Sequence, residues 1–119
     1  MAYLKYRAKL KGEQSRKIRH RVREAISACG LDEIASSAIG TLSRGQRKRV
    51  AIADAVLLRP RLLLLDDVFA GLDEASREAM VSMIVSFKSF AAVIVSGHET
   101  EWFERTGARI IELKGGKVS

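Results

Sequence analysis

Two adjacent carboxylates, Asp66 and Asp67, directly follow an apolar run over residues 62–65. Such a run is typical of a strand buried on both faces of a parallel sheet, and open α/β sheets place ligand sites at the carboxyl ends of their strands. Carboxylates there can bind Mg²⁺, which usually takes one or two of them together with substrate phosphates. The alternative is a polar turn that ends a strand, and an isolated pair of carboxylates favours that interpretation.

A second candidate site lies earlier in the chain, where Ser43, Gly45 and Gln46 begin a basic helix. Free N–H groups and the helix dipole favour anions at a helix start, and Ser43 adds a hydroxyl donor. The spacing of Ser43 and Gln46 also fits a capping box, in which the two side chains serve only the first turn of their own helix. A phosphate site and a plain helix cap are both open at this point.

The first half of the chain is predicted to be mainly helical. Apolar residues at three- and four-residue spacing predict a helix over residues 13–29, with Gly30 as its C-terminal cap. Residues 31–37 form a short connection or a helical turn. A second helix is predicted from Ser43 to Leu58, where the following Arg59-Pro60 pair ends it.

The second half is predicted to be a strand, helix, strand unit with parallel strands. Residues 61–65 and 91–96 form the two buried strands, and Asp73 caps the helix between them. A short helix then covers about residues 99–105. A last strand over residues 109–113 is turned back by Gly115-Gly116 into Lys117-Val118.

The composition bounds the kind of protein. The 119 residues, 47% of them hydrophobic and 29% charged, suffice for one small domain or part of a larger one. The single cysteine, Cys29, excludes an internal disulfide framework and a multi-thiolate metal site within one chain, and it indicates a reducing cytosol. Cys29, Trp102 and Phe103 are expected to be packing residues, and His20 is expected to be solvated.

The charge is uneven along the chain. The net charge is +7, but residues 1–59 hold 14 basic and 5 acidic residues, whereas residues 60–119 hold 7 basic and 9 acidic ones. A basic first half suits a nucleic-acid surface, a lid over phosphates or a solvated helical face, and charge alone does not choose among them.

Four stretches in this order, LSRGQRKRVAIA, LLRPRLLLLDD, AGLD and VIVSGHE, resemble the second half of an ABC transporter ATPase. Residues 42–46 are similar to its signature motif, residues 62–67 to its Walker B strand, residues 70–73 to its D-loop and His98 to its switch histidine. The stretches YLKYRAKLKG, ACGLDEIA and RIIELKGGKV extend the resemblance over essentially the whole chain. The pattern is most similar to exporter-type subunits that pair with a separate permease.

The resemblance implies ATP and Mg²⁺ as cofactors. Asp66 would bind Mg²⁺, Asp67 would activate the attacking water, and His98 would sense the γ-phosphate. These roles suit phosphoryl transfer, which depends on positioning and charge neutralisation more than on covalent chemistry.

The resemblance also implies a second ATPase subunit. Ser43, Gly45 and Gln46 would contact ATP held by that opposing subunit, and so would act in trans. Asp73, in the D-loop, would lie at the interface between the two subunits and couple their sites.

The sequence departs from the family pattern at three kinds of position. Asp67 stands where the family usually has glutamate, which sets its carboxylate back by one methylene, and a misplacement of about 1 Å can cost on the order of a hundredfold in rate. Val68 replaces the usual proline, Arg44 a common glycine and Asp54 a frequent arginine. No stretch has the form GxxxxGK[ST], the Gly-rich loop whose N–H groups and lysine hold the phosphates, and the Q-loop is missing as well.

The sequence therefore predicts an α/β chain, a partial P-loop NTPase fold of the ABC ATPase type. Residues 1–59 would form part of the helical signature subdomain, and residues 60–119 the Walker B, D-loop and switch-histidine half of the core. We expect the ATP-binding subunit of an exporter, or a fragment of one, cytoplasmic and peripheral on the cytoplasmic face of the membrane. Its partners would be a permease, a second ATPase subunit and a separate chain with the Walker A segment.

Without the Gly-rich loop we expect weak or no ATP binding and no hydrolysis by this chain alone. Two alternatives stay open. The first alternative is a non-enzymatic basic module that binds nucleic acid or anionic lipid, of which nucleic acid is the less expected partner. The second is a non-functional truncated remnant.

Overall fold

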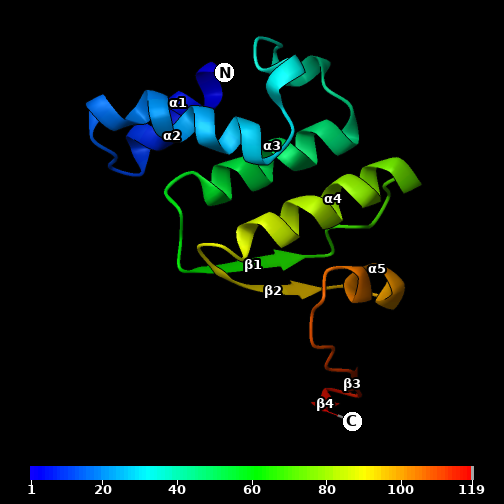
Figure 1. The fold of residues 1–119 in the computed structure, drawn as a ribbon. Helices are drawn as coiled ribbons and strands as arrows, with labels where there is room; N and C mark the ends of the chain where they lie inside the picture. Colours follow the sequence, from blue (N-terminus) through cyan, green and yellow to red (C-terminus); the bar gives the residue numbers. More distant parts are fainter. Residues whose placement is uncertain (119) are drawn as a thin grey trace.

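The computed structural model describes residues 1–118, in which four helices are stacked above a two-stranded parallel sheet and a fifth, short helix lies beside the end of that sheet (Figure 1). The helices are α1 (Ala2–Leu10), α2 (Ser15–Ala28), α3 (Arg44–Val56), α4 (Glu74–Phe87) and α5 (Thr100–Arg105), with 3-10 turns η1 (Asp32–Ile34) and η2 (Ile39–Thr41). The strands are β1 (Leu62–Asp66), β2 (Ala92–Ser96), β3 (Leu113–Lys114) and β4 (Lys117–Val118). The α/β class and the helical first half are confirmed.

The two predicted helices of the first half, α2 and α3, form where the apolar spacing places them. Both pack with α1, and the core they share is lined by Leu4, Ala8, Val22, Ala25, Ile26, Val50, Ile52, Ala53 and Val56. Gly30 follows α2 with a φ of +63°, the left-handed conformation expected of a C-terminal glycine cap. Helix α1 was not predicted from apolar spacing, because only two of its residues, Leu4 and Ala8, are buried.

An ion-pair cluster ties α3 to α1. The Asp54 carboxylate accepts a hydrogen bond from Nε of Arg7 at 3.0 Å and lies 3.2 Å from Nζ of Lys11. Burial alone would raise the pKa of Asp54, but the hydrogen bonds from Arg7 and Lys11 outweigh it and lower that pKa below its ordinary value. The aspartate that replaces a frequent arginine of the family is therefore a structural link in this chain.

Strands β1 and β2 pair in parallel, with Leu62 opposite Ala92 and Asp66 opposite Ser96. Helix α4 connects them and lies over one face of the sheet, which buries Leu63 and Leu65. The other face is open, and we call it the open face: its apolar members are Leu62, Leu64, Ala92 and Ile94.

The prediction of strands buried on both faces is wrong for the described residues. Leu62 is 54% exposed, Leu64 66% and Ile94 59%, although parallel sheets normally have both faces covered. Their apolar character fits a covered face, but no part of residues 1–118 covers it.

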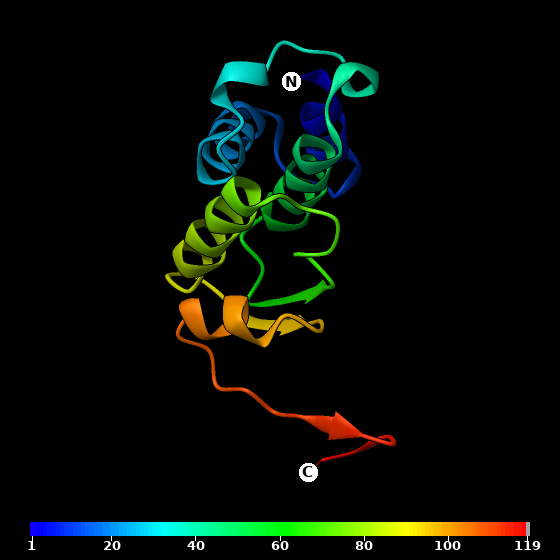
Figure 2. The ribbon, with the colours of Figure 1, turned by 90° about the vertical axis from the view of Figure 1, so that its right-hand side faces the viewer.

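The C-terminal segment also differs from the prediction. Residues 109–112 form no strand; only the short antiparallel pair β3 and β4 forms, around Gly115 and Gly116 at positive φ. The segment runs away from the sheet (Figure 2), and Ile111 and Leu113 on it are exposed. Within residues 1–118, β2 pairs with β1 alone, so residues 109–112 have no strand beside them to extend.

The expected packing residues are confirmed. Cys29 is fully buried, and the ring of Phe69 lies 6.1 Å from that of Trp102 and 5.5 Å from that of Phe103, between centroids. His20 is exposed and pairs with Glu24 one helical turn later. None of the helices described in residues 1–118 is long and apolar enough to cross a membrane.

Candidate functional site

Asp66 is the last residue of β1, and its side chain lies on the open face, exposed to solvent. The Ser96 hydroxyl, directly opposite on β2, donates a hydrogen bond to Oδ1 of Asp66. A carboxylate has about four lone-pair sites, so this bond orients Asp66 and still leaves acceptor capacity for a cation.

The chain turns sharply at Asp67. Its φ of 56° lies in the left-handed region, which aspartate tolerates better than most residues, and its amide nitrogen donates to the carbonyl oxygen of Ser96 at 2.8 Å. A Cβ built on Gly97 would lie 3.6 Å from Oδ1 of Asp67. The Asp67 carboxylate therefore points toward the loop that follows β2.

That loop holds His98, which is exposed and whose carbonyl oxygen accepts a hydrogen bond from the Thr100 amide at 3.2 Å. Gly97 is needed beside it, because a Cβ there would lie only 2.8 Å from Cζ of Phe103. Since the carboxyl ends of two parallel strands meet at one edge, the structure brings Asp66, Asp67 and His98 to the same edge of the sheet.

The capping box at the start of α3 is present. The backbone amide of Gln46 donates a hydrogen bond to Oγ of Ser43 at 3.1 Å, and the backbone amide of Ser43 donates one to the side-chain Oε1 of Gln46 at 2.9 Å. Both side chains therefore serve the helix itself. An anion at this helix start would use the N–H groups of Arg44 and Gly45, which come before the first backbone bond of the helix.

The start of α3 lies against the turn that follows β1. Nζ of Lys48 donates to the carbonyl oxygens of Ala70 at 2.8 Å and Asp67 at 3.3 Å. A Cβ built on Gly45 would lie 3.5 Å from Oγ of Ser76, at the start of α4. The structure thus places the predicted signature residues beside the predicted D-loop.

Asp73 caps α4. Its Oδ1 accepts a hydrogen bond from the Ser76 amide at 2.8 Å, and this bond lowers the pKa of the Asp73 carboxyl. The residue is exposed, so it is also available on the surface where the resemblance implies a subunit interface.

Two residues of this site were missed by the sequence analysis. Ser96 is found only once the strand register is known, because pairing two five-residue strands puts it opposite Asp66. Lys48 lies within a run of basic residues, and the run gave no sign that this one lysine turns inward to two carbonyl groups.

The residues at the sheet edge suit a magnesium ion that is shared with phosphates. Within residues 1–118, no three His, Cys, Asp or Glu side chains come together as a metal cage. One oriented carboxylate with spare acceptor capacity matches the habit of Mg²⁺, which keeps several waters and shares its remaining positions with substrate phosphates. Asp66 is the residue that would hold it.

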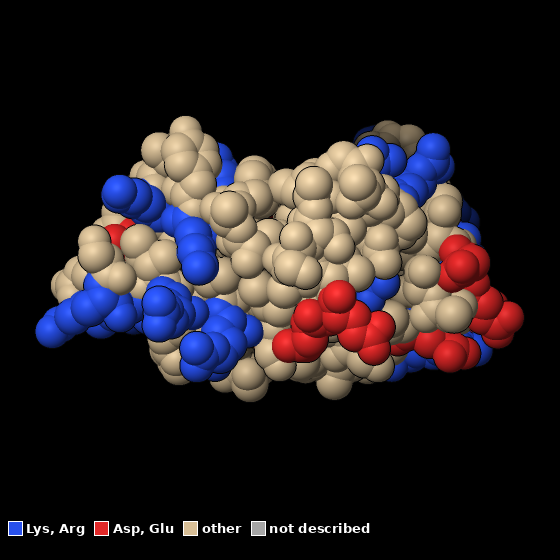
Figure 3. Space-filling model, turned by 90° about the horizontal axis from the view of Figure 1, so that it is seen from above, with Lys and Arg blue, Asp and Glu red and all other residues tan. Residues whose placement is uncertain are grey.

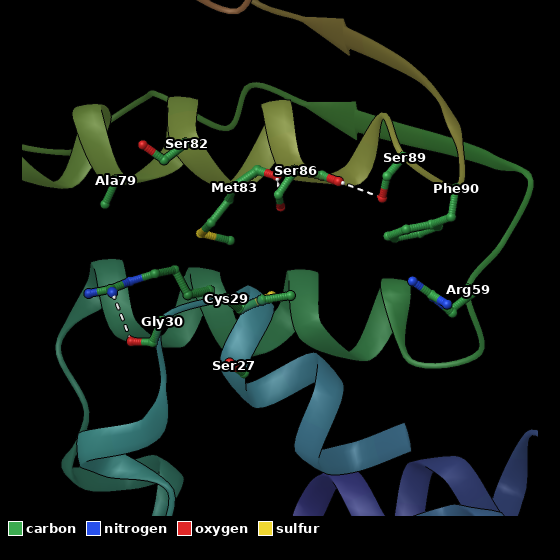
Figure 4. Close-up of a pocket in the computed structure, with 12 residues that line it drawn as sticks. Ser27, Cys29, Gly30, Arg59, Ala79, Ser82, Met83, Ser86, Ser89 and Phe90 are labelled. Carbon is green, nitrogen blue, oxygen red and sulfur yellow. Dashed lines mark hydrogen bonds between the residues drawn. The ribbon is translucent and has the colours of Figure 1, made fainter. Parts of the chain in front are cut away.

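A cavity of about 490 Å³ lies elsewhere, between α4, α3 and the C-terminal end of α2 (Figure 4). Arg49 and Arg59 line it together with serines of α4, and Nη1 of Arg49 donates to the Gly30 carbonyl oxygen at 3.3 Å. None of the predicted site residues lines this cavity, so it is separate from the sheet-edge site.

The basic residues of the first half gather over the α1–α2 end of the molecule, at the left in Figure 3. Six exposed cations on these two helices have no acidic partner within residues 1–118: Lys5, Lys9, Arg16, Lys17, Arg19 and Arg23. The expected solvated helical face is therefore present, and it lies away from the sheet edge.

Comparison with known proteins decides the family. A family model described as ABC transporter matches residues 3–70, more than half of the chain. The chain belongs to the ABC transporter family. The match includes Ser43, Gln46, Asp66 and Asp67 and ends before Asp73 and His98.

Individual relatives are ATP-binding proteins of this family. The chain is 30% identical over 98% of its length to the uncharacterized ABC transporter ATP-binding protein YxlF of Bacillus subtilis. It is 33% identical over 95% of its length to the tungstate uptake system ATP-binding protein TupC of Peptoclostridium acidaminophilum. The chain spans 40% of the Bacillus protein and 54% of the tungstate protein.

A solved structure agrees with the fold. CbiO1 of Clostridium perfringens, described as part of the ABC transporter complex cbiONQ, superposes with a TM-score of 0.69 at 28% identity. The superposition covers 80% of this chain and 39% of that one. The partial ABC ATPase fold predicted from the sequence is confirmed.

Proposed function

We propose that this ABC transporter chain supplies the magnesium-binding carboxylate, the water-activating carboxylate and the switch histidine of an ATP-binding subunit. The observation that supports it is the joint placement of Asp66, Asp67 and His98 at one sheet edge, with Ser96 bonded to both aspartates. Bound Mg²⁺ would neutralise charge that develops on the transferred phosphoryl group.

In this proposal each aspartate of the sheet edge has its own role in ATP hydrolysis. Asp66, oriented by Ser96, would hold the cation, and Asp67 would accept a proton from the attacking water or orient that water. The left-handed backbone at Asp67 aims its carboxylate toward the His98 loop, where the γ-phosphate would lie. Because aspartate is one methylene shorter than the usual glutamate, hydrolysis would be slow or would pass through a second water.

The signature residues would act across a dimer. Ser43, Gly45 and Gln46 lie at the start of α3, where N–H groups favour phosphate; Ser43 is exposed and the other two are half-buried. Asp73 lies exposed on the neighbouring D-loop. In this proposal a second ATPase subunit presents its nucleotide to this surface. The contact of Lys48 with the turn after β1 would link that surface to Asp67.

Nucleotide binding also needs the Gly-rich loop, and the printed sequence has none of the form GxxxxGK[ST]. We propose that a polypeptide segment carrying this loop completes the site. On this basis the 119-residue chain alone binds Mg-ATP weakly or not at all.

The partners follow from the relatives. CbiO1 belongs to a complex with further components, so we propose a transmembrane permease as partner and a peripheral place at the cytoplasmic face of the membrane. The sequence pattern predicts export, but the relatives from Peptoclostridium and Rhodobacter capsulatus are named for tungstate uptake and cobalt import. Their names favour uptake, and transport into or out of vesicles that contain the assembled complex distinguishes the two directions.

The experiment that tests the function is ATP hydrolysis by the chain together with the loop segment and the permease. We expect Mg²⁺-dependent hydrolysis that Asp66→Ala abolishes, while Ser36→Ala, at an exposed residue outside the site, leaves it unchanged. Hydrolysis by the chain alone that Asp66→Ala removes would contradict the need for the loop segment.

A second candidate function rests on the six unpaired cations of α1 and α2. Binding of nucleic acid or anionic lipid through them would weaken steeply as salt rises and would not respond to Asp66→Ala. A salt titration with a DNA duplex and with phosphatidylserine vesicles separates this candidate from the first.

A further inference from the structure

The cavity between α3, α4 and the C-terminal end of α2 has basic ends and an apolar middle. Nη1 of Arg49 donates to the Gly30 carbonyl oxygen at 3.3 Å, and Gly30 and Arg59 lie at opposite ends of the cavity in Figure 4. Cys29 and Met83 lie between these ends, and both are buried. The charge of Arg49 reaches the middle of the cavity, because it opposes the rise that burial causes in the pKa of Cys29.

No acidic side chain balances the two cations of this cavity. Neither Arg49 nor Arg59 forms an ion pair within residues 1–118, and no Asp or Glu of that range lines the cavity. An adjoining hollow contains Glu24, but this carboxylate already pairs with His20 and Arg21. A guanidinium has five N–H donors, so both ends of the cavity keep donors for an anion.

The backbone at Arg59 is unusual for a residue with a side chain. Its φ of 50° lies in the left-handed region, which glycine adopts at less cost. The guanidinium carbon of Arg59 lies 5.1 Å from the centroid of the Phe90 ring, and both residues line the cavity. The turn before Pro60 does not itself need a cation, so a binding role would account for the arginine at this position.

The dimensions of the cavity limit the ligand. Its volume of about 490 Å³ is within the range of small-molecule sites, roughly 300–1,000 Å³. Arg49 and Val56 are seven residues apart in α3, which is about 10 Å along the helix axis, and Arg59 lies beyond the end of that helix. A single carboxylate or phosphate would therefore not reach both guanidinium groups.

We propose that this cavity binds a small linear dianion, an α,ω-dicarboxylate, with one carboxylate on each arginine and its methylene chain against Met83. Each guanidinium would hold a carboxylate through two parallel N–H bonds, a geometry that lysine lacks. The ligand would bridge two helices, since Arg49 lies on α3 and Met83 on α4. The site is independent of the proposed function, because no residue of the sheet edge lines it.

The test is calorimetry with the full 119-residue chain and suberate, a dicarboxylate with a chain of methylenes between its ends. The comparison ligands are succinate, which is shorter, and octanoate, which lacks the second carboxylate. We expect one suberate per chain, with a dissociation constant on the order of 100 μM. Succinate and octanoate should each bind about 10-fold more weakly, because neither can use both arginines.

Variants of the chain separate binding in the cavity from general attraction of anions. Arg49→Gln and Arg59→Gln each remove one cation and should weaken suberate binding about 10-fold. Ser86→Phe keeps both cations but adds a ring at an exposed position that lines the cavity, and it should weaken binding to a similar extent. Arg23→Gln is the matched control: it removes the same charge from an exposed arginine outside the cavity, and the affinity should not change. Circular dichroism confirms that each variant is folded.

Amide resonances of the unaltered chain provide a second measurement that does not depend on the variants. The Gly30 amide, at one end of the cavity, should shift when suberate binds, whereas the Gly97 amide at the sheet edge should not. Absence of suberate binding, equal affinity for octanoate, or equal binding by the control and the cavity variants would each overturn the inference. A peptide with a glutamate at each end of a leucine stretch that binds this cavity in place of suberate would also overturn it.

Discussion

The Ser96 hydroxyl donates a hydrogen bond to the Asp66 carboxylate across the parallel β1–β2 pair. The carbonyl oxygen of the same serine accepts the amide of Asp67 at 2.8 Å. One residue of β2 therefore orients the Asp66 carboxylate and holds the backbone of Asp67, and the strand register sets the geometry of the site.

We first predict the effect of removing the Ser96 hydroxyl. Ser96→Ala should leave the fold intact, because the backbone bond to Asp67 remains, but it should weaken Mg²⁺-dependent ATP binding by about 10-fold in the completed site. The measurement is a titration of Mg²⁺ at fixed ATP. A Ser96→Thr variant, which keeps the hydroxyl, should recover most of the affinity, and equal affinity for Ala and Thr would contradict the positioning role.

The second prediction concerns the ion pairs of Asp54. Asp54→Asn should lower the free energy of unfolding by about 1 kcal/mol at neutral pH, because Arg7 and Lys11 lose their carboxylate. The pKa of Asp54 is lowered in the folded state from its ordinary value of 3.8, so its contribution is present above that value and disappears as the pH falls through the folded-state pKa.

Urea unfolding at pH 7 and at about pH 2 measures this difference. The difference in the free energy of unfolding between the wild type and Asp54→Asn should disappear at the lower pH. Asp32→Asn, at an exposed aspartate of η1, serves as the control and should show little gap at either pH. A gap that persists at low pH would show that Asp54 acts through something other than its charge.

The third prediction concerns Gly97, beside the switch histidine. Gly97→Ala places a Cβ 2.8 Å from Cζ of Phe103, so the ring or the loop must move, and stability should fall by about 1–3 kcal/mol. Gly40→Ala is the matched control, since a Cβ there has no atom within 4 Å and the backbone φ is not positive. Thermal unfolding of both variants gives the answer, and equal melting temperatures would refute the close approach.

The fourth prediction concerns the buried thiol. Burial raises the pKa of Cys29 to about 12, which leaves almost no thiolate at neutral pH. The folded chain should therefore react with a disulfide reagent orders of magnitude more slowly than the chain in denaturant. Fast labelling at pH 8 without denaturant would show that α2 opens around this residue.

Local patterns predicted most of the fold. The spacing of Val22, Ala25 and Ile26 predicted α2, and Asp73 was correctly identified as the cap of α4. The exposure of the leucines of β1 could not be predicted, because a continuous apolar strand sequence predicts burial on both faces. Nothing within residues 1–118 covers Leu62 and Leu64.

The site was predicted less completely than the fold. Asp66, Asp67 and His98 stood out as strand-end residues, and their common edge follows from parallel pairing. Ser96 and Lys48 did not stand out, because their contacts depend on the strand register and on how α3 crosses the turn after β1. The division at residues 59 and 60 stays a prediction.

The most direct test of the central claim is calorimetry of Mg-ATP binding to this chain, alone and with the segment that carries the Gly-rich loop. We expect no measurable heat from the chain alone and one binding event in the mixture, lost with Asp66→Ala. Absence of binding in a mixture that forms a stable complex, or full binding that ignores Asp66→Ala, would contradict it.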